Sequence, residues 1–262
     1  MRIASVGHLL LAVAMISLGI LGLVHGKLAP LWDPVPPNIP AREVLAYLSS
    51  LISLATGTGL LVQRTATLAA RVLFASLMLW LLLFRVPDIF LVHNFDAFWP
   101  FFETGVMVSA AWVLYTWFAA DSDRKRLSFV TGNKGLRIAR ILYGLAMIFF
   151  GLGHFRYLDN TISLIPHWLP WHPFWARFTG CALIAAGIGI LIGVFARLAA
   201  ALSTFELGLF VFLVWVPILA AGSKDAFQWS ETILSAVLLT GAWVVAESYR
   251  DTPWFAVRTR AA

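Results

Sequence analysis

Residues 68–87 read LAARVLFASLMLWLLLFRVP, and residues 198–217 begin with the same Leu-Ala-Ala and end with the same Val-Pro. Matching positions in the two stretches lie 130 residues apart. The same separation relates four further pairs: Gly57 and Gly187, Gly59 and Gly189, Pro36 and Pro166, Pro40 and Pro170. The sequence therefore predicts an internal duplication, and because both copies are long and apolar, it predicts two halves in a lipid bilayer.

The composition also indicates a membrane protein. Hydrophobic residues make up 60% of the chain and charged residues 12%, against about 45–50% and about 25% in a soluble domain. A water-exposed surface needs more charges than this, although a soluble all-helical protein remains the alternative. Apolar runs long enough to cross about 30 Å of hydrocarbon are expected at 5–26, 42–63, 66–86, 101–120, 137–155, 173–194, 197–219 and 230–248.

These runs predict an all-α integral membrane protein with eight transmembrane helices in two parallel-oriented four-helix bundles. The polar stretch 121–136 is charged and has no apolar helical face, so we expect a cytoplasmic loop there. Four crossings return the chain to the same side, which gives the two halves the same orientation. The expected domains are 1–120, the linker 121–136, a second repeat at 137–249 and a cytoplasmic tail at 250–262.

The positive charges follow a membrane rule, not the pattern of a nucleic-acid-binding surface. Six of the 19 lysines and arginines fall in predicted outer segments: Lys27, Arg42, Arg85, Arg156, Arg177 and Lys224. The other thirteen fall in predicted inner segments, which favours cytoplasmic termini in a bacterial-type plasma (inner) membrane. Residues 1–26 have no convincing cleavage site, so we interpret them as a retained first helix.

The second half carries a recognisable motif: Gly-Leu-Gly-His-Phe at 151–155, a Pro- and Trp-rich stretch at 165–180, Ala-Arg-Leu-Ala-Ala at 196–200 and Val-Pro at 216–217. This pattern resembles the DoxX-like family of small four-helix membrane proteins, over about residues 137–247. The first half resembles it more loosely, through Leu-Val-His at 23–25 and Thr-Gly-Thr-Gly-Leu-Leu at 56–61. The resemblance implies a four-helix unit in each half. It also implies a link to membrane thiosulfate or quinone redox systems, but no specific reaction.

Five of the six histidines fall on the predicted outer side: His25, His93, His154, His167 and His172. Imidazole can ligate a metal or relay protons, so a pocket containing His25 and His154 and a metal site at His154, His167 and His172 are hypotheses. We interpret His25 and His154 as equivalent positions of the repeat. The alternative is that each histidine forms a hydrogen bond with backbone at a helix end.

Glu206 lies about midway along the seventh predicted helix. A charged residue there is unfavourable by about 2.5–3.5 kcal/mol, so the carboxyl must be protonated, paired or hydrated. It is the candidate proton carrier, and the alternative is a neutral carboxyl hydrogen-bonded between helices. Its counterpart 130 residues earlier is Ser76, so any such role is asymmetric.

Two acids and two arginines complete the predicted outer pocket. Glu103 and Glu231 each follow an Asp-Ala-Phe and are expected to open the fourth and eighth helices, where the backbone dipole favours acids. Arg85 and Arg177 lie near outer helix ends, where they either pair with these carboxylates or bind an anionic group.

The predicted function is a membrane redox accessory or quinone-interacting subunit. The single cysteine, Cys181, excludes an internal dithiol centre, so electrons would come from a redox partner protein or a bound cofactor. A small-solute transporter and a lipid-binding or assembly scaffold are the alternatives. The lipid bilayer is the expected partner in every case, and nucleic acid is not.

Overall fold

A computed structural model describes residues 4–36 and 39–257, and the described chain is helical without β-strands. Eight of its helices are long and apolar enough to cross a membrane. They cover Val6–His25, Arg42–Leu61, Ala66–Val92, Phe95–Phe118, Asn133–Arg156, His172–Ile192, Ala196–Ala220 and Ala226–Glu247. The predicted all-α membrane class is therefore confirmed, with each predicted span inside or overlapping an observed helix.

The chain forms two compact units, Met1–Ala139 and Arg140–Ala262. The division lies inside helix α8 (Asn133–Arg156), and not in a loop. The expectation that 121–136 is a loop without helices is wrong, because α6 (Asp121–Arg126), α7 (Ser128–Thr131) and the start of α8 occupy it; its role as a cytoplasmic linker stays a prediction. This segment packs on the first unit: the Trp112 indole donates to the Val130 carbonyl at 2.8 Å, and Arg71 pairs with Asp123 at 2.9 Å.

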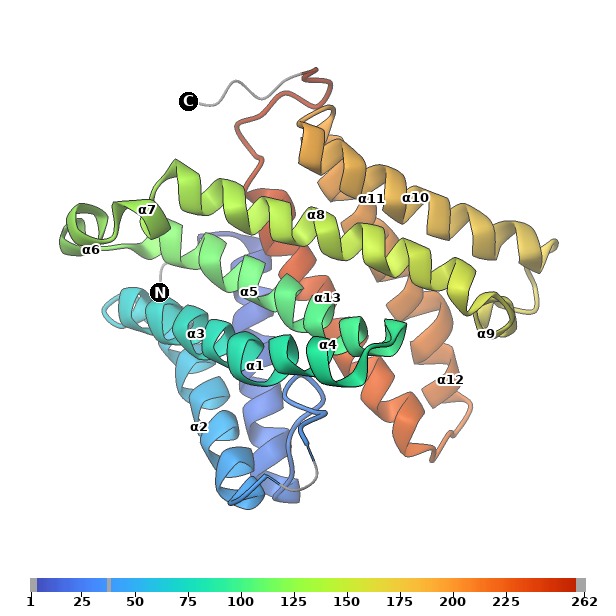
Figure 1. Cartoon of the computed structure of the whole chain (residues 1–262), viewed down its shortest axis with the longest axis horizontal. Helices are drawn as coiled ribbons and strands as arrows, with labels where there is room; N and C mark the ends of the chain where they lie inside the picture. Colours follow the sequence, from blue (N-terminus) through green and yellow to red (C-terminus); the bar gives the residue numbers. More distant parts are fainter. Residues whose placement is uncertain (1–3, 37–38, 258–262) are drawn as a thin grey trace. The chain divides into compact units, whose positions relative to one another are not determined.

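The first unit contains four spans. Helix α1 (Val6–His25) packs along α2 (Arg42–Leu61), α2 contacts α3 (Ala66–Trp80), and α3 contacts α5 (Phe98–Phe118) (Figure 1). Gly19 and Gly57 allow the close α1–α2 contact, since a Cβ at Gly19 would lie 2.6 Å from the Leu54 nitrogen. Small residues at such contacts are typical of membrane helix pairs.

The second unit also contains four spans, of which the first begins just before the division between the units. It contains most of α8, the short α9 (Leu158–Leu164), α10 (His172–Ile192), α11 (Ala196–Leu209), α12 (Val216–Ala220) and α13 (Ala226–Glu247) (Figure 1). A Cβ at Gly151 would lie 2.5 Å from the Gly180 carbonyl oxygen, so α8 and α10 also meet backbone to backbone. Helix α11 then contacts both α10 and α13.

A π-helical segment interrupts the third span of each unit. These are η1 (Leu81–Arg85), followed by α4 (Val86–Val92), and η3 (Phe210–Trp215), followed by α12. Pro87 and Pro217 lie just beyond the two segments. A proline lacks the N–H donor and its ring clashes with the carbonyl four residues earlier, so a local widening of the helix relieves both problems. The two prolines were evident in the sequence, but the widened turns were not predicted.

The C-terminal segment folds back on the second unit instead of extending as a free tail. The Phe195 amide donates to the Ala256 carbonyl at 2.8 Å, and Arg197 donates to the carbonyls of Arg250 and Thr252 at 2.8 and 3.0 Å. The described part of the expected tail, residues 250–257, therefore packs on the second unit.

Candidate functional site

Arg85, predicted as a pocket residue, has a structural role in the first unit. Its side chain is 1% exposed and donates to Thr104 Oγ1 at 3.1 Å and to the carbonyls of Leu31, Asp33 and Pro34. Glu103 lies near enough to act on it electrostatically. Arg85 thereby fixes the loop between α1 and α2, where Trp32 is also buried and donates to Ser53 Oγ at 3.0 Å.

Glu103 and Glu231 do not open their helices, so this expectation is wrong. The helices begin earlier than predicted, at Phe98 and Ala226, and neither has an acid in its first turn. Asp225 caps α13 instead, accepting from the Gln228 amide at 2.9 Å. Glu103 is buried, at 8% exposed, and Glu231 is half-buried.

His25 and His154 both form the backbone hydrogen bond that was the alternative interpretation. Their Nδ1 atoms lie 2.9 Å from the carbonyls of Leu21 and Phe150. A carbonyl can only accept, so Nδ1 carries the proton and Nε2 remains the basic nitrogen of the neutral ring. His154 is half-buried and its ring centroid lies 5.5 Å from that of Phe210, whereas His25 is exposed.

The hypothetical metal ligands do not form a three-ligand group. The His167 and His172 rings lie 6.3 Å apart, but no cluster of three His, Cys, Asp or Glu residues suited to a metal occurs in residues 4–36 and 39–257. Arg177 is exposed and donates to its own helix, at the Pro173 carbonyl, 3.1 Å away. His93, also predicted on the outer side, is exposed and contacts the Leu91 carbonyl.

Glu206 belongs to a polar cluster between α8 and α11, which we define as Tyr143, Ser203 and Glu206. The Tyr143 hydroxyl lies 2.9 Å from Ser203 Oγ, and Glu206 acts on Tyr143 electrostatically. Tyr143 is fully buried and Glu206 is 8% exposed. No hydrogen-bond partner for Glu206 Oε1 occurs among the described residues. The carboxyl therefore lies inside the protein with unused hydrogen-bonding capacity.

Glu206 lies between two contacts of α8 with the third span of the second unit. Tyr143 contacts Ser203 of α11 and His154 contacts Phe210 of η3, so the two spans run in the same direction. Glu206 falls between these levels, about 14 Å along the helix from Arg197 at ~1.5 Å per residue. That is close to half of the ~30 Å hydrocarbon thickness.

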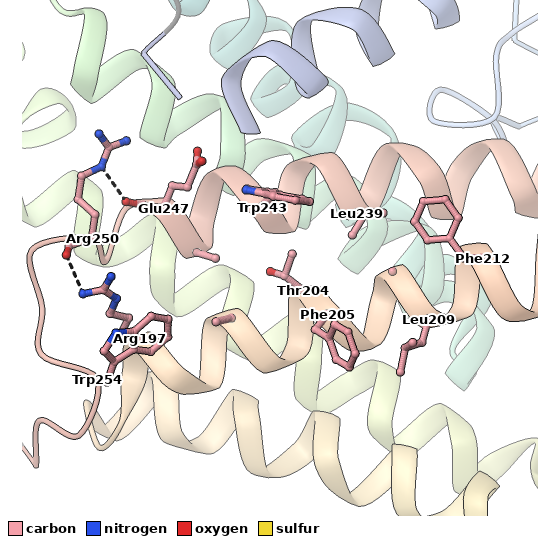
Figure 2. Close-up of a pocket in the computed structure, with 13 residues that line it drawn as sticks. Arg197, Thr204, Phe205, Leu209, Phe212, Leu239, Trp243, Glu247, Arg250 and Trp254 are labelled. Carbon is pink, nitrogen blue, oxygen red and sulfur yellow. Dashed lines mark hydrogen bonds between the residues drawn. The ribbon is translucent and has the colours of Figure 1, made fainter. Parts of the chain in front are cut away.

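A different face of α11 forms one wall of an apolar groove (Figure 2). The groove encloses about 510 Å³, and α13 forms the opposite wall. Figure 2 shows Phe205 and Leu209 along α11, Phe212 on the η3 segment that continues it, and Leu239 and Trp243 on α13. The residues on α11 and η3 recur at three- or four-residue steps from Arg197 to Phe212, which places them on one stripe of this span.

The C-terminal segment closes one end of this groove. Arg197, Glu247, Arg250 and Trp254 gather there (Figure 2). The Arg197 guanidinium carbon lies 4.1 Å above the centre of the Trp254 ring, a cation–π geometry. Arg197 and Arg250 were predicted only as cations of the inner segments, and no role was predicted for Glu247 or Trp254. The spacing of the groove residues on α11 could have been predicted from the sequence. Their packing against α13 and the position of the C-terminal segment could not.

A family model, DoxX, matches residues 135–215. This part of the chain is therefore similar to the DoxX family. The match covers α8 to α11 and reaches the end of η3, so it confirms the resemblance over most of the predicted region. Together with the eight apolar helices it supports an integral, multi-pass membrane protein. No curated protein and no solved structure matches the chain.

Proposed function

We propose that this DoxX protein is a membrane redox accessory that binds a quinone in its second unit, with Glu206 as the proton carrier. One observation carries the proposal: a carboxyl near mid-membrane depth is buried with no partner for Oε1. An ionisable residue inside the membrane is a functional-site hypothesis by default. Its burial in hydrocarbon is unfavourable, so such residues are rare and mostly mark functional sites.

Residues of the second unit suit a quinone headgroup, which accepts hydrogen bonds at its two carbonyl oxygens. The buried Trp175 indole N–H has no acceptor among the described residues, so it can donate to a quinone carbonyl. The basic Nε2 of His154 is an acceptor, which suits a hydroxyl of the reduced quinol. Arg85 is committed to the loop carbonyls of the first unit, so it is not part of this proposed site.

The proton balance gives Glu206 a defined task. Reduction of a quinone to a quinol takes up two electrons and two protons. The electrons come from a redox partner protein, since one cysteine cannot supply them as a dithiol. The Glu206 carboxyl donates one proton, and its reprotonation completes the cycle. The nearby Tyr143 and Ser203 hydroxyls, which are hydrogen-bonded to each other, are the groups we assign to this return step. The second proton comes from water at the membrane surface.

A photoreactive short-chain quinone tests this proposal on the protein in phospholipid nanodiscs. We expect saturable labelling of α8, α10 or α11 that unlabelled quinone displaces, and an affinity that changes with pH. Glu206→Gln should remove the pH dependence, whereas the exposed Glu43→Gln serves as the matched control. Labelling that does not saturate, or a pH profile unchanged in Glu206→Gln, would falsify the proposal.

We also propose the orientation on which this scheme depends, with both termini cytoplasmic in a bacterial-type inner membrane. The distribution of lysines and arginines supports it. Reporter fusions at both termini and at the α6–α7 connection test it. All three should report from the cytoplasm, and a periplasmic signal from any of them contradicts the orientation.

One observation favours the transporter as a second candidate. Transporter sites often lie at helices interrupted at corresponding positions of two repeats, and η1 and η3 are such interruptions. Uptake of a panel of small solutes into protein-containing vesicles tests this function. Accumulation above that of protein-free vesicles supports it, and equal accumulation for every solute rules out transport of that panel.

A further inference from the structure

We propose that the groove between α11 and α13 binds one anionic phospholipid, with the phosphate at Arg197 and an acyl chain along Phe205 and Phe212. This site lies on a different face of α11 from the Tyr143, Ser203 and Glu206 cluster. It does not depend on the proposed quinone function, and either proposal can fail without the other.

The charge at the closed end of the groove fits a phosphate. Two arginines and one glutamate line this end, which leaves a net charge of one positive unit. Arg197 forms no ion pair with a carboxylate in the described part of the chain. Its Nη1 donates to two backbone carbonyls, so its Nε and Nη2 donors stay available. Arginine in this state recognises phosphate oxygens through its remaining N–H groups.

The rest of the groove fits an acyl chain. Its lining between Ala201 and Phe212 is apolar apart from Thr204, whose hydroxyl already donates to the Ala200 carbonyl at 2.8 Å. Phe205 and Phe212 are each 64% exposed, so the groove opens sideways to the lipid. From Arg197 to Phe212 the helix rises about 22 Å, at ~1.5 Å per residue, which exceeds half of a ~30 Å hydrocarbon layer.

The membrane depth of the two ends agrees with this occupant. Arg197 lies at the start of its span and Glu247 at the end of the last span, so the charged end of the groove is at the membrane surface. Trp254 lies beside them, and tryptophan favours the headgroup level. A lipid of one leaflet would thus place its phosphate and its chain beside side chains of matching polarity.

Native mass spectrometry of the full-length protein in detergent, with equimolar dioleoyl phosphatidylglycerol and dioleoyl phosphatidylcholine, tests the proposal. We expect one phosphatidylglycerol retained per chain in preference to phosphatidylcholine. Arg197→Gln should reduce that preference about five-fold, the effect of one surface arginine on an anionic lipid. Arg197→Lys should retain part of it, and Arg64→Gln, an exposed cation of the first unit, should leave it unchanged.

A second variant tests the chain-binding part of the groove. A Cβ at Gly208 would lie 3.7 Å from Leu239 Cδ1, an ordinary contact, so Gly208→Ala should fold and keep the lipid. Gly208→Leu places a larger side chain in the groove and should reduce retention of both lipids. If Gly208→Leu does not fold, the two Arg197 variants still decide the headgroup contact.

Three results would overturn the proposal. Equal retention of the two lipids by the unmodified protein excludes recognition of the anionic headgroup. An unchanged preference in Arg197→Gln removes the assigned residue. Displacement of phosphatidylglycerol by equimolar oleate, or by glycerol phosphate without a chain, shows that a fatty acid or a free phosphate is the ligand.

Discussion

Substitution of Gly187 by alanine tests the backbone contact that holds α8 and α10 together. A Cβ at this position would lie 2.6 Å from Ile148 Cγ1 and also close to the Gly144 carbonyl oxygen, both on α8. Carbon atoms pack best about 3.5–4.0 Å apart, so α8 and α10 must separate by about 1 Å to admit one methyl group. Gly208→Ala is the matched control, because its Cβ would meet Leu239 Cδ1 at 3.7 Å.

The two substitutions are expected to change stability in opposite directions. Overpacking lowers the free energy of unfolding by about 1–3 kcal/mol, and a gap of 0.5–1 Å forfeits a quarter to a half of each affected dispersion contact. Alanine is favoured over glycine inside a helix by about 1 kcal/mol. Gly208→Ala adds only the higher helix propensity of alanine. Gly187→Ala adds the same propensity but also forces α8 and α10 apart. We therefore expect Gly208→Ala to exceed Gly187→Ala in stability by about 1–3 kcal/mol.

Reversible unfolding in mixed micelles, followed by circular dichroism, measures both variants against the unmodified protein. The midpoint should shift to lower denaturing-detergent fraction for Gly187→Ala and should stay or rise for Gly208→Ala. Equal midpoints for the two variants would refute the reasoning, because both carry the same added methyl group. Such a result would mean that α8 and α10 do not meet at these glycines.

Three further changes test other parts of the structure by the same unfolding measurement. Arg85→Leu leaves the loop carbonyls without their donor and should lower stability by about 3 kcal/mol, with faster proteolysis between α1 and α2. Tyr143→Phe removes one hydrogen bond and should cost only about 1 kcal/mol, because Ser203 keeps its bond to a backbone carbonyl. Burial raises the pKa of Tyr249, which follows the last span, from 10.0 to about 12. The folded state therefore favours the neutral phenol: stability is full below pH 10 and falls between pH 10 and 12 by about 1.4 kcal/mol per unit. Tyr249→Phe should lack that fall, and a persistent fall contradicts this origin.

The membrane spans were predictable from the sequence because hydrophobic length is a local property. Pro87 and Pro217 were likewise visible, as were the small residues that bring α8 and α10 together. Helix starts were less predictable. The aromatic residues Phe98 and Trp99 belong to α5, and Asp225 ends the preceding loop as a cap, so the two acids lie beyond the first turn.

The candidate site was less predictable because it depends on which residues a tertiary contact engages. Arg85 and Arg177 looked alike in the sequence, yet one binds loop carbonyls from more than 50 residues away and the other is exposed. Whether such an arginine is buried or exposed depends on the path of a long loop. Glu206 was predictable because an acid inside an apolar run needs an explanation wherever its neighbours lie.

The packing within each unit supports the proposed repeat and corrects one equivalence in it. Gly19 meets Ser50 and Leu54, while Gly151 meets Gly180 and Ile184. The α2 and α10 positions differ by 130, but those of α1 and α8 differ by 132. On this alignment the counterpart of His154 is Gly22, which faces Ser50, and not His25. The two histidines are therefore not a symmetric pair, and a site that uses both requires a different argument.

The same alignment explains why the groove belongs to the second unit. At a separation of 130, Arg197 corresponds to Thr67, Phe205 to Ala75 and Gly208 to Met78. Thr67 uses its hydroxyl to bond the Phe118 carbonyl at 2.6 Å, so the first unit has no free cation at this position. Met78 carries a long side chain where the groove has none, and the polar Glu206 corresponds to Ser76. The proposed duplication thus accounts for the shared helix order and the paired π segments. The groove and the buried acid depend on residues that only the second unit has at these positions. We therefore expect ligand binding to be confined to the second unit.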